Sequence, residues 1–344
     1  MGKFNVAEKN NKNILDFSVN VNMLGMPQSV KDACKYIQEL CCFYPDEGCS
    51  ELRNALAKKH GLEPENFLCG NGADDIIFRI PLAFKPKKAL ILAPTYEEYK
   101  NALETVNCEI NYCILDEKKG FRADYSILNA VTPDIDIVYI CNPNNPTGIS
   151  IEVPLIKKLA EVCRNNNALL VIDECFIGFM ISENCSMKNY INDFDNIVII
   201  DAFTKLYCIP GFRLGYCISS NRKILENIKR AGQDFAVSIP AQIAGIAALE
   251  DNDYIETTQK IVSYESRWLI NEIRKFGIKV YDAEANFIFI KSPFDGFQKK
   301  LLDKGVKVRY CGNFVGLQGE HIRIAVRKHE DNEKFIDAVK EIFI

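Results

Sequence analysis

Residues 201–216 read Asp-Ala-Phe-Thr-Lys-Leu-Tyr-Cys-Ile-Pro-Gly-Phe-Arg-Leu-Gly-Tyr, and the rest of the chain is organised around this stretch. Lys205 follows the apolar run 197–200, which predicts a buried strand. Arg213 comes next, in a Pro-Gly-Phe-Arg-Leu-Gly turn. A lysine amine can form a Schiff base with an aldehyde where its surroundings lower its pKa, and the planar guanidinium of arginine suits a phosphate. A single lysine is usually a solvated surface residue, so this interpretation depends on the stretches that accompany it.

Three further stretches carry candidate functional side chains: Gly70-Asn71-Gly72-Ala73-Asp74, residues 142–148 (Asn-Pro-Asn-Asn-Pro-Thr-Gly) and Asp173-Glu174-Cys175-Phe176. With Lys205 and Arg213, they resemble the fold-type I aminotransferase superfamily (class I/II), whose members depend on pyridoxal 5′-phosphate (PLP). PLP is an aldehyde that carries a phosphate, so a reactive amine with a phosphate clamp suits it. The resemblance implies an α/β fold, with a mainly parallel, seven-stranded-type sheet between helices in a large domain and a small α+β domain at the C-terminus.

The order of apolar runs along the chain supports the same fold class. Short strand-like runs rich in Val and Ile alternate with helical patterns, which is typical of a parallel sheet covered on both faces. The predicted strands are 88–93, 109–115, 135–141, 168–172, 197–200 and 214–218. Ligands of such sheets bind at the carboxyl ends of the strands, and Lys205 and Asp173 both follow a predicted strand.

The predicted domain boundaries follow a change in this pattern after about residue 250. The predicted divisions are 1–44, an N-terminal arm and helix packing on the small domain; 45–250, the large PLP-binding domain; and 251–344, the small C-terminal domain. One long helix is expected over 253–276, followed by strands at 278–281, 287–290, 306–309 and 321–326, a helix over 297–304, and a closing helix over 330–342.

Composition limits the classes of function. The 344 residues carry a net charge of -4 with no Lys/Arg-rich run, so no nucleic-acid partner is expected. No signal peptide or apolar run of membrane-spanning length is evident, which predicts a cytoplasmic protein without a membrane partner. The 14 cysteines form no C-x-x-C pair and the histidines number 3, so we expect apolar core thiols in a reducing compartment and no metal site.

The resemblance assigns the cofactor-binding residues. Gly72, Ala73 and Asp74 precede a helical pattern, and free backbone N–H groups at a helix start attract phosphate; a Gly-x-Gly by itself is more often only a turn. Thr204 and Arg213 are expected at the same phosphate. Tyr96 is expected to stack on the cofactor ring, although a core tyrosine is the alternative.

Asp173 and Asn145 are expected at the polar edge of the ring. A buried carboxylate needs a cationic partner, and by resemblance the pyridine nitrogen supplies it to Asp173, while Asn145 donates to the phenolic oxygen. Lys205 and Asp173 are therefore the predicted catalytic residues. The chain departs from the family at Phe176, where many members have a tyrosine, and at Ala202, where Ser or Thr is common.

Substrate residues are also implied by the resemblance. Arg323, on the predicted strand 321–326, is expected to grip a substrate carboxylate, which leaves Arg309 for a second anion such as a phosphate. Asn20 is also expected near the substrate. Without this context, an exposed arginine is more often a solvated surface residue. Tyr44, in Tyr-Pro-Asp, matches a tyrosine that reaches the cofactor phosphate of the neighbouring subunit. This predicts a homodimer with shared active sites.

The function implied is that of a PLP-dependent enzyme acting on a small, phosphorylated amino acid or amine. The stretches 15–22, 204–216 and 308–317 look most like the threonine-phosphate decarboxylase branch, which implies a carboxy-lyase of cobalamin biosynthesis. The alternative is an aminotransferase of histidinol-phosphate type that uses glutamate and 2-oxoglutarate, and a third reading is a non-catalytic PLP-fold regulator. The decarboxylase branch has His-Gly-Gly in its N-terminal arm, whereas this chain has Glu8-Lys9-Asn10 after residues 4–7.

Overall fold

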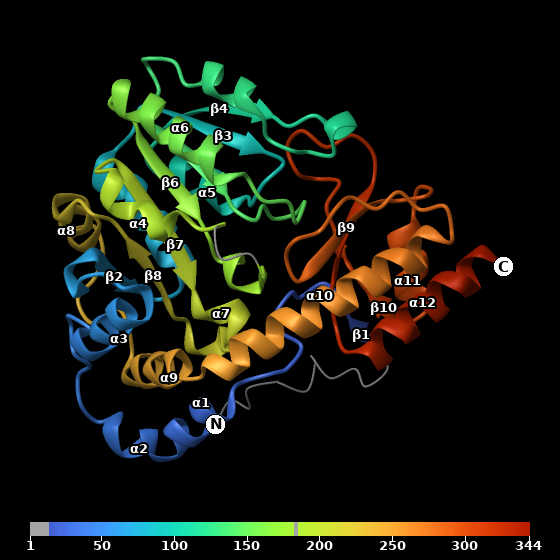
Figure 1. Cartoon of the computed structure of the whole chain (residues 1–344), viewed down its shortest axis with the longest axis horizontal. Helices are drawn as coiled ribbons and strands as arrows, with labels where there is room; N and C mark the ends of the chain where they lie inside the picture. The colour runs from blue at the N-terminus through green and yellow to red at the C-terminus, as the bar shows by residue number, and fades with distance from the viewer. Residues whose placement is uncertain (1–13, 182–184) are drawn as a thin grey trace.

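The computed structural model describes residues 14–181 and 185–344, and a seven-stranded sheet forms the core of its larger part (Figure 1). The strand order is β2-β8-β7-β6-β5-β3-β4. The strands are β2 (Phe67–Gly70), β3 (Lys88–Ala93), β4 (Glu109–Ile114), β5 (Ile137–Cys141), β6 (Leu169–Asp173), β7 (Ile197–Ala202) and β8 (Gly215–Ile218). Only β8 runs antiparallel to its two neighbours. The predicted α/β class with a mainly parallel sheet is confirmed.

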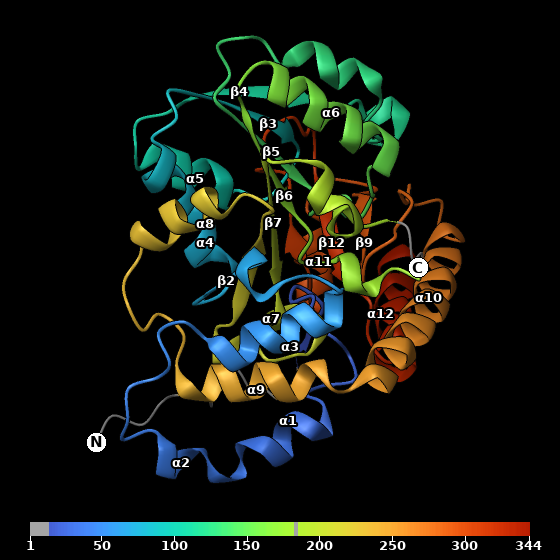
Figure 2. The ribbon, with the colours of Figure 1, turned by 60° about the vertical axis from the view of Figure 1, so that its left-hand side comes forward.

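Both faces of this sheet are buried under helices, as continuous apolar strands require. Helices α4 (Ala73–Phe84), α5 (Glu98–Glu104) and α8 (Arg222–Arg230) cover one face, and α6 (Val153–Asn165) covers the other (Figure 2). Helices α3 (Ser50–His60), α7 (Phe203–Leu206) and α9 (Ile239–Leu249) complete the larger part.

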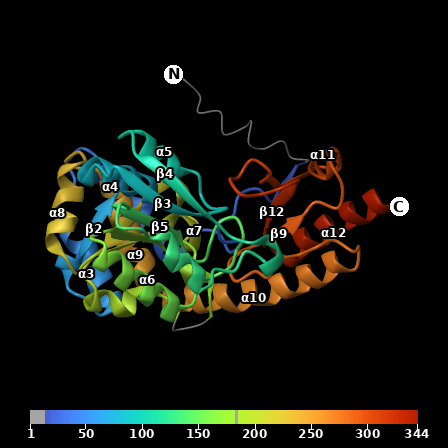
Figure 3. The ribbon, with the colours of Figure 1, turned by 90° about the horizontal axis from the view of Figure 1, so that it is seen from above.

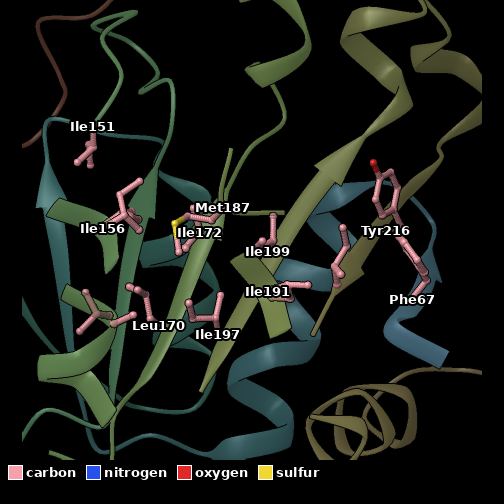
Figure 4. Close-up of a cluster of buried hydrophobic side chains, with 14 of the residues drawn as sticks. Phe67, Ile151, Ile156, Leu170, Ile172, Met187, Ile191, Ile197, Ile199 and Tyr216 are labelled. Atoms are coloured by element: carbon pink, nitrogen blue, oxygen red, sulfur yellow. The ribbon is translucent and has the colours of Figure 1, made fainter. Parts of the chain in front are cut away.

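Side chains alternate between the two faces because successive residues of a strand point in opposite directions. Along β7, Ile197 and Ile199 enter the core below α6, whereas Val198 and Ile200 enter the core below α4 and α8. Figure 4 shows Ile197 and Ile199 beside Leu170 and Ile172 of β6, in the cluster to which they belong. The register Ile172↔Ile199 aligns the carboxyl ends of these two strands, where Asp173 and Lys205 follow.

The smaller part has its own core around a three-stranded antiparallel sheet of order β11-β12-β9 (Figure 3). The strands of this sheet are β9 (Phe287–Lys291), β11 (Arg309–Tyr310) and β12 (His321–Ala325), and the smaller part also contains strand β10 (Val306–Lys307). Its helices are α10 (Asn252–Arg274), α11 (Phe297–Asp303) and α12 (His329–Phe343). Helix α10 runs from the larger part to the smaller one. No helix in either described range is both long and apolar enough to span a bilayer.

The N-terminal segment contacts both parts. Strand β1 (Leu15–Asp16) pairs in parallel with β10 of the smaller part. Helix α1 (Gln28–Ala33), followed by α2 (Ile37–Leu40), packs instead against α9 of the larger part. The Glu8-Lys9-Asn10 departure lies outside the described residues. The domain boundaries placed after residues 44 and 250 stay a prediction.

The structure differs from the predicted elements in several places. Strand β2 and helices α8 and α9 were not predicted, and residues 278–281 form a single bridge, Val280↔Ile290, in place of a strand. Strand β2 has four residues and depends on pairing with β8, which lies far away in sequence, so local periodicity could not identify it.

Candidate active site

Lys205 lies on the one-turn helix α7, directly after strand β7, at the carboxyl edge of the parallel sheet. It lines a pocket of about 180 Å³ between the two parts of the molecule. The pocket is lined by Asn20, Ala73, Asp74, Ile77, Tyr96, Cys141, Asn145, Asp173, Cys175, Phe176, Ala202, Thr204, Lys205, Pro210, Arg213 and Arg323. Most of the site residues predicted from the sequence are therefore brought together here.

The Lys205 amine is placed among groups that favour its neutral form. Burial, followed by the positive charge of Arg323 and then that of Arg213, lowers the pKa of Lys205, whereas Cys175 and Asp74 act in the opposite direction. A lysine whose pKa is lowered offers a larger fraction of free amine, which is the nucleophilic form. The environment suits a lysine that reacts with a carbonyl group.

Asp173 is the last residue of β6 and has 4% of its surface exposed. Its carboxylate accepts hydrogen bonds from the Tyr99 hydroxyl at 2.6 Å and the Cys175 backbone N–H at 2.9 Å. No Lys, Arg or His of the described residues forms an ion pair with it. Burial raises the pKa of Asp173, and the hydrogen bond from Tyr99 opposes that rise. A buried carboxylate of this kind suits a cationic N–H group of a ligand.

The opposite end of the pocket carries groups that favour an anion. Gly72 precedes helix α4 with φ of 85°, and a Cβ there would lie 2.7 Å from Arg213 Nη2, so only glycine fits. The Arg213 guanidinium therefore lies against the start of an α-helix, where N–H groups and the helix dipole attract negative charge. Arg213 is half exposed and pairs with Asp74 at 3.2 Å (Nη2 to Oδ2), while Thr204 is buried beside them.

Tyr96 is a wall of the pocket. Its hydroxyl donates to Asp74 at 3.1 Å, and its ring meets Tyr99 edge-on at 5.7 Å between centroids. The contacts with Asp74 and Tyr99 therefore fix the Tyr96 ring at the carboxyl edge of the sheet. Phe176 turns its ring edge-on to Phe287 at 5.0 Å and carries no hydroxyl group, so it contributes apolar surface only.

Arg323, on β12, is a buried cation without an acidic partner in the described chain. It donates to the Asn145 side-chain oxygen and to the Ser18 carbonyl, and its Nε has no hydrogen-bond partner. The Nδ2 of buried Asn20 also lacks a partner. Burial, and to a smaller extent the charge of Arg309, lowers the pKa of Arg323 to about 10. Buried donors left unpaired in this way suit an anionic ligand.

The contact with Arg323 also fixes Asn145. Arginine has only donors, so the Asn145 atom that faces it is the amide oxygen. The Asn145 amide nitrogen is then left to donate elsewhere in the pocket that this residue lines.

Gly72, Arg309 and Tyr44 do not line the pocket. Gly72 acts through its close approach to Arg213, as described above. Arg309 lies beside the pocket and faces Glu97, with 3.8 Å between Nη2 and Oε2. Tyr44 is 84% exposed on the surface, with its ring 5.0 Å from that of Phe235.

Tyr99 is the residue that sequence reasoning missed. It lies on α5, is fully buried, and makes a direct contact with Asp173. Tyr96 precedes α5 and Tyr99 lies in its first turn, so the spacing of the two tyrosines gives no helical-face signal. The partner, Asp173, is on a strand 74 residues away, so sequence alone could not identify the contact.

Comparison with known proteins identifies the family of the chain. The sequence model of the family Aminotransferase class I and II matches residues 12–339. A threonine-phosphate decarboxylase of Salmonella typhimurium is 34% identical over 341 residues, covering 96% of this chain and 91% of that protein. A histidinol-phosphate aminotransferase of Methanococcus aeolicus is 31% identical, with 96% and 90% covered. The crystal structure of the histidinol-phosphate aminotransferase from Clostridium acetobutylicum superposes with a TM-score of 0.91 and 30% identity, covering 96% of this chain and 99% of that chain. The chain therefore belongs to the aminotransferase class I and II family, which consists of PLP-dependent enzymes.

Proposed function

We propose that this chain binds PLP through Lys205 and uses it to break a bond at the α-carbon of a small, phosphorylated amino acid or amine. One observation carries the proposal: the pocket holds a buried carboxylate, Asp173, without a cation, and a buried guanidinium, Arg323, without an anion. A ligand with a basic ring nitrogen at one end and an anionic group at the other would satisfy both. PLP joined by an amino-acid substrate has these groups.

The residues present fit the cofactor. The start of α4, Thr204 and Arg213 would hold the phosphate, with Asp74 orienting Arg213. Asp173 would keep the pyridine nitrogen protonated, and Tyr96 would cover one face of the ring. The Asn145 amide would donate to the phenolic oxygen without the help of a hydroxyl at Phe176. When bound, PLP supplies an electron sink for the pair released at the α-carbon.

Lys205 has two roles in this proposal. Its amine would hold the cofactor aldehyde, and when it is not so engaged the same amine would be a base beside the α-carbon of the substrate. The lowered pKa of Lys205 supports the second role, because a base that is neutral near the working pH can accept a proton.

The substrate class follows from the cations around the mouth of the pocket. Arg323 and Asn20 would bind a substrate carboxylate, and Arg309 a second anion such as a phosphate. Both named relatives act on phosphorylated compounds, which supports this class. Decarboxylation of a threonine-phosphate-like amino acid and transamination of a histidinol-phosphate-like amine both fit. The bond held perpendicular to the cofactor ring decides between them, and it depends on the substrate's pose.

We also propose that the enzyme is a homodimer whose active site is completed by Tyr44 of the second copy. Two exposed aromatic residues accompany this tyrosine: Phe43, the preceding residue, is 68% exposed, and Phe235, whose ring lies 5.0 Å from that of Tyr44, is 44% exposed. Exposed apolar patches of this kind favour a protein partner.

The first experiment tests cofactor attachment. The purified protein should be yellow with PLP, and borohydride should remove the colour and fix the cofactor covalently at Lys205. Lys205→Ala should lack the covalent adduct, while the surface variant Lys223→Ala should behave as the wild type does. A colourless wild type in the presence of PLP would end the proposal.

The second experiment chooses the reaction. PLP-loaded protein is mixed with excess L-glutamate and no keto acid, and the cofactor absorbance is followed. Conversion to the pyridoxamine form identifies an aminotransferase and excludes the decarboxylase reading. If the absorbance stays, O-phospho-L-threonine is added, and release of CO2 identifies a decarboxylase.

A further inference from the structure

Arg309 is held by an acidic residue of the larger part of the molecule. Glu97 directly follows the pocket residue Tyr96, and its Oε2 lies 3.8 Å from Arg309 Nη2. Its other oxygen, Oε1, accepts a hydrogen bond from Asn313 Nδ2 at 3.0 Å. Both side chains of the ion pair are more than two-fifths exposed, 44% for Arg309 and 42% for Glu97. The pair therefore lies at the solvent-facing edge of the pocket.

The sheet places Arg309 beside the buried Arg323. The two residues are directly opposite each other in the antiparallel pair of β11 and β12, so their side chains emerge on one face. Two like charges directly opposite are unfavourable unless an anion lies near. Glu97 supplies that anion to Arg309, whereas Arg323 donates to neutral groups, the Asn145 amide oxygen and the Ser18 carbonyl.

We propose that Glu97 is a specificity-determining residue: it is the internal counter-ion of Arg309, and the distal anionic group of the substrate must displace it. This inference rests on the proposed function. It adds that Glu97 pairs with Arg309 until the distal anionic group of a substrate binds there. The strength of the Glu97–Arg309 ion pair then sets the affinity of the enzyme for that group.

The geometry suits displacement. A long, half-exposed ion pair contributes little to stability, so a phosphate with two charges and several acceptor oxygens can replace the carboxylate at Arg309. Asn313 holds Glu97 in place when the pair is formed and can retain it after Arg309 is taken. A substrate without a distal anion leaves the pair intact, and its binding is then independent of Glu97.

The test uses PLP-loaded protein, in which the cofactor fills the site beside Arg213, and inorganic phosphate as the probe in calorimetric titration. Glu97→Gln removes the charge but keeps the size and the amide acceptor for Asn313. Its affinity for phosphate should rise about threefold to fivefold, the range expected for an exposed ion pair. Glu98→Gln removes the same charge one residue away, where no ion pair with Arg309 is formed, and should stay within about twofold of the wild type.

The double variant Glu97→Gln with Arg309→Gln identifies the competing cation, because the gain in affinity should disappear in it. The Michaelis constant for O-phospho-L-threonine, or for histidinol phosphate in an aminotransferase, should fall in Glu97→Gln. The constant for the unphosphorylated analogue should not change. The inference is overturned if Glu97→Gln binds phosphate like Glu98→Gln, or if the gain survives the loss of Arg309. If the wild type were colourless with PLP but Glu97→Gln still bound phosphate more tightly than the wild type, the proposed cofactor would be refuted. The proposed role of Glu97 would then still hold.

Discussion

The hydroxyl of Tyr99 offers a sharp test of how the site keeps its key carboxylate ionised. Tyr99→Phe removes one oxygen from a fully buried ring and leaves its contacts with Tyr96 and Tyr139 intact. The Asp173 carboxylate then retains the backbone N–H and the thiol of Cys175. No new cavity of consequence forms, so the measured effect belongs to the lost hydrogen bond.

The magnitude follows from the charge on the acceptor. A hydrogen bond to a charged group contributes about 1.5–3 kcal/mol, and one between neutral groups about 1 kcal/mol. Burial already raises the pKa of Asp173, and loss of the hydroxyl donor at 2.6 Å should raise it further. A carboxyl with a raised folded pKa favours the folded state at low pH, and this stability is lost as the pH rises through the folded pKa. The deficit of Tyr99→Phe relative to the wild type should therefore grow with pH.

The control is the same chemical change in the neighbouring ring. Tyr139 stacks on Tyr99 at 5.3 Å, is fully buried, and its hydroxyl has no hydrogen-bond partner. Tyr139→Phe should be neutral or should stabilise the protein by up to about 1 kcal/mol, because an unpaired buried hydroxyl is removed.

The assay is denaturant unfolding of the cofactor-free protein at about pH 5 and about pH 8, which bracket the range in which a raised carboxyl titrates. We expect Tyr99→Phe to lose about 1 kcal/mol at the lower pH and about 1.5–3 kcal/mol at the higher pH. Equal losses in the two variants, or a loss that does not depend on pH, would refute the reasoning.

Three further predictions concern charges. Arg323→Lys should keep the yellow cofactor but raise the Michaelis constant about tenfold to a hundredfold, because lysine lacks the fork of donors; an unchanged constant would contradict the carboxylate role. Burial acts to raise the pKa of Glu117, but hydrogen bonds, the largest from Lys291, lower it to about 2. The Glu117 carboxylate therefore stabilises the fold above about pH 4.5, and this stabilisation is lost as the pH falls towards 2. Glu117→Gln should accordingly cost about 1–2 kcal/mol in denaturant unfolding at neutral pH, and the gap should close in acid. Lys188 is buried between Glu174 and Asp201, so Lys188→Met should cost about 3–5 kcal/mol in the same assay, whereas the exposed Lys158→Met should cost almost nothing.

Local sequence determined most of the cofactor site. Asp173 ends a strand, and Lys205 and Asn145 follow strands, whose apolar runs can be recognised from the local sequence; the carboxyl ends of parallel strands meet at one edge of the sheet. The helix start after Gly72 was likewise evident from small residues before a helical pattern. These features depend on periodicity and backbone conformation, which a few adjacent residues specify.

Tertiary structure decided which groups satisfy one another. Tyr99 meets Asp173 because helix α5 packs on the sheet below it, and Arg323 meets Asn145 across 178 residues. Glu97 faces Arg309 because the smaller part lies over the mouth of the larger one, and the opposition of Arg309 to Arg323 depends on strand register. Hydrogen bonds and ion pairs form over a few ångströms between groups far apart in the chain, so their partners are set by packing and not by the local sequence.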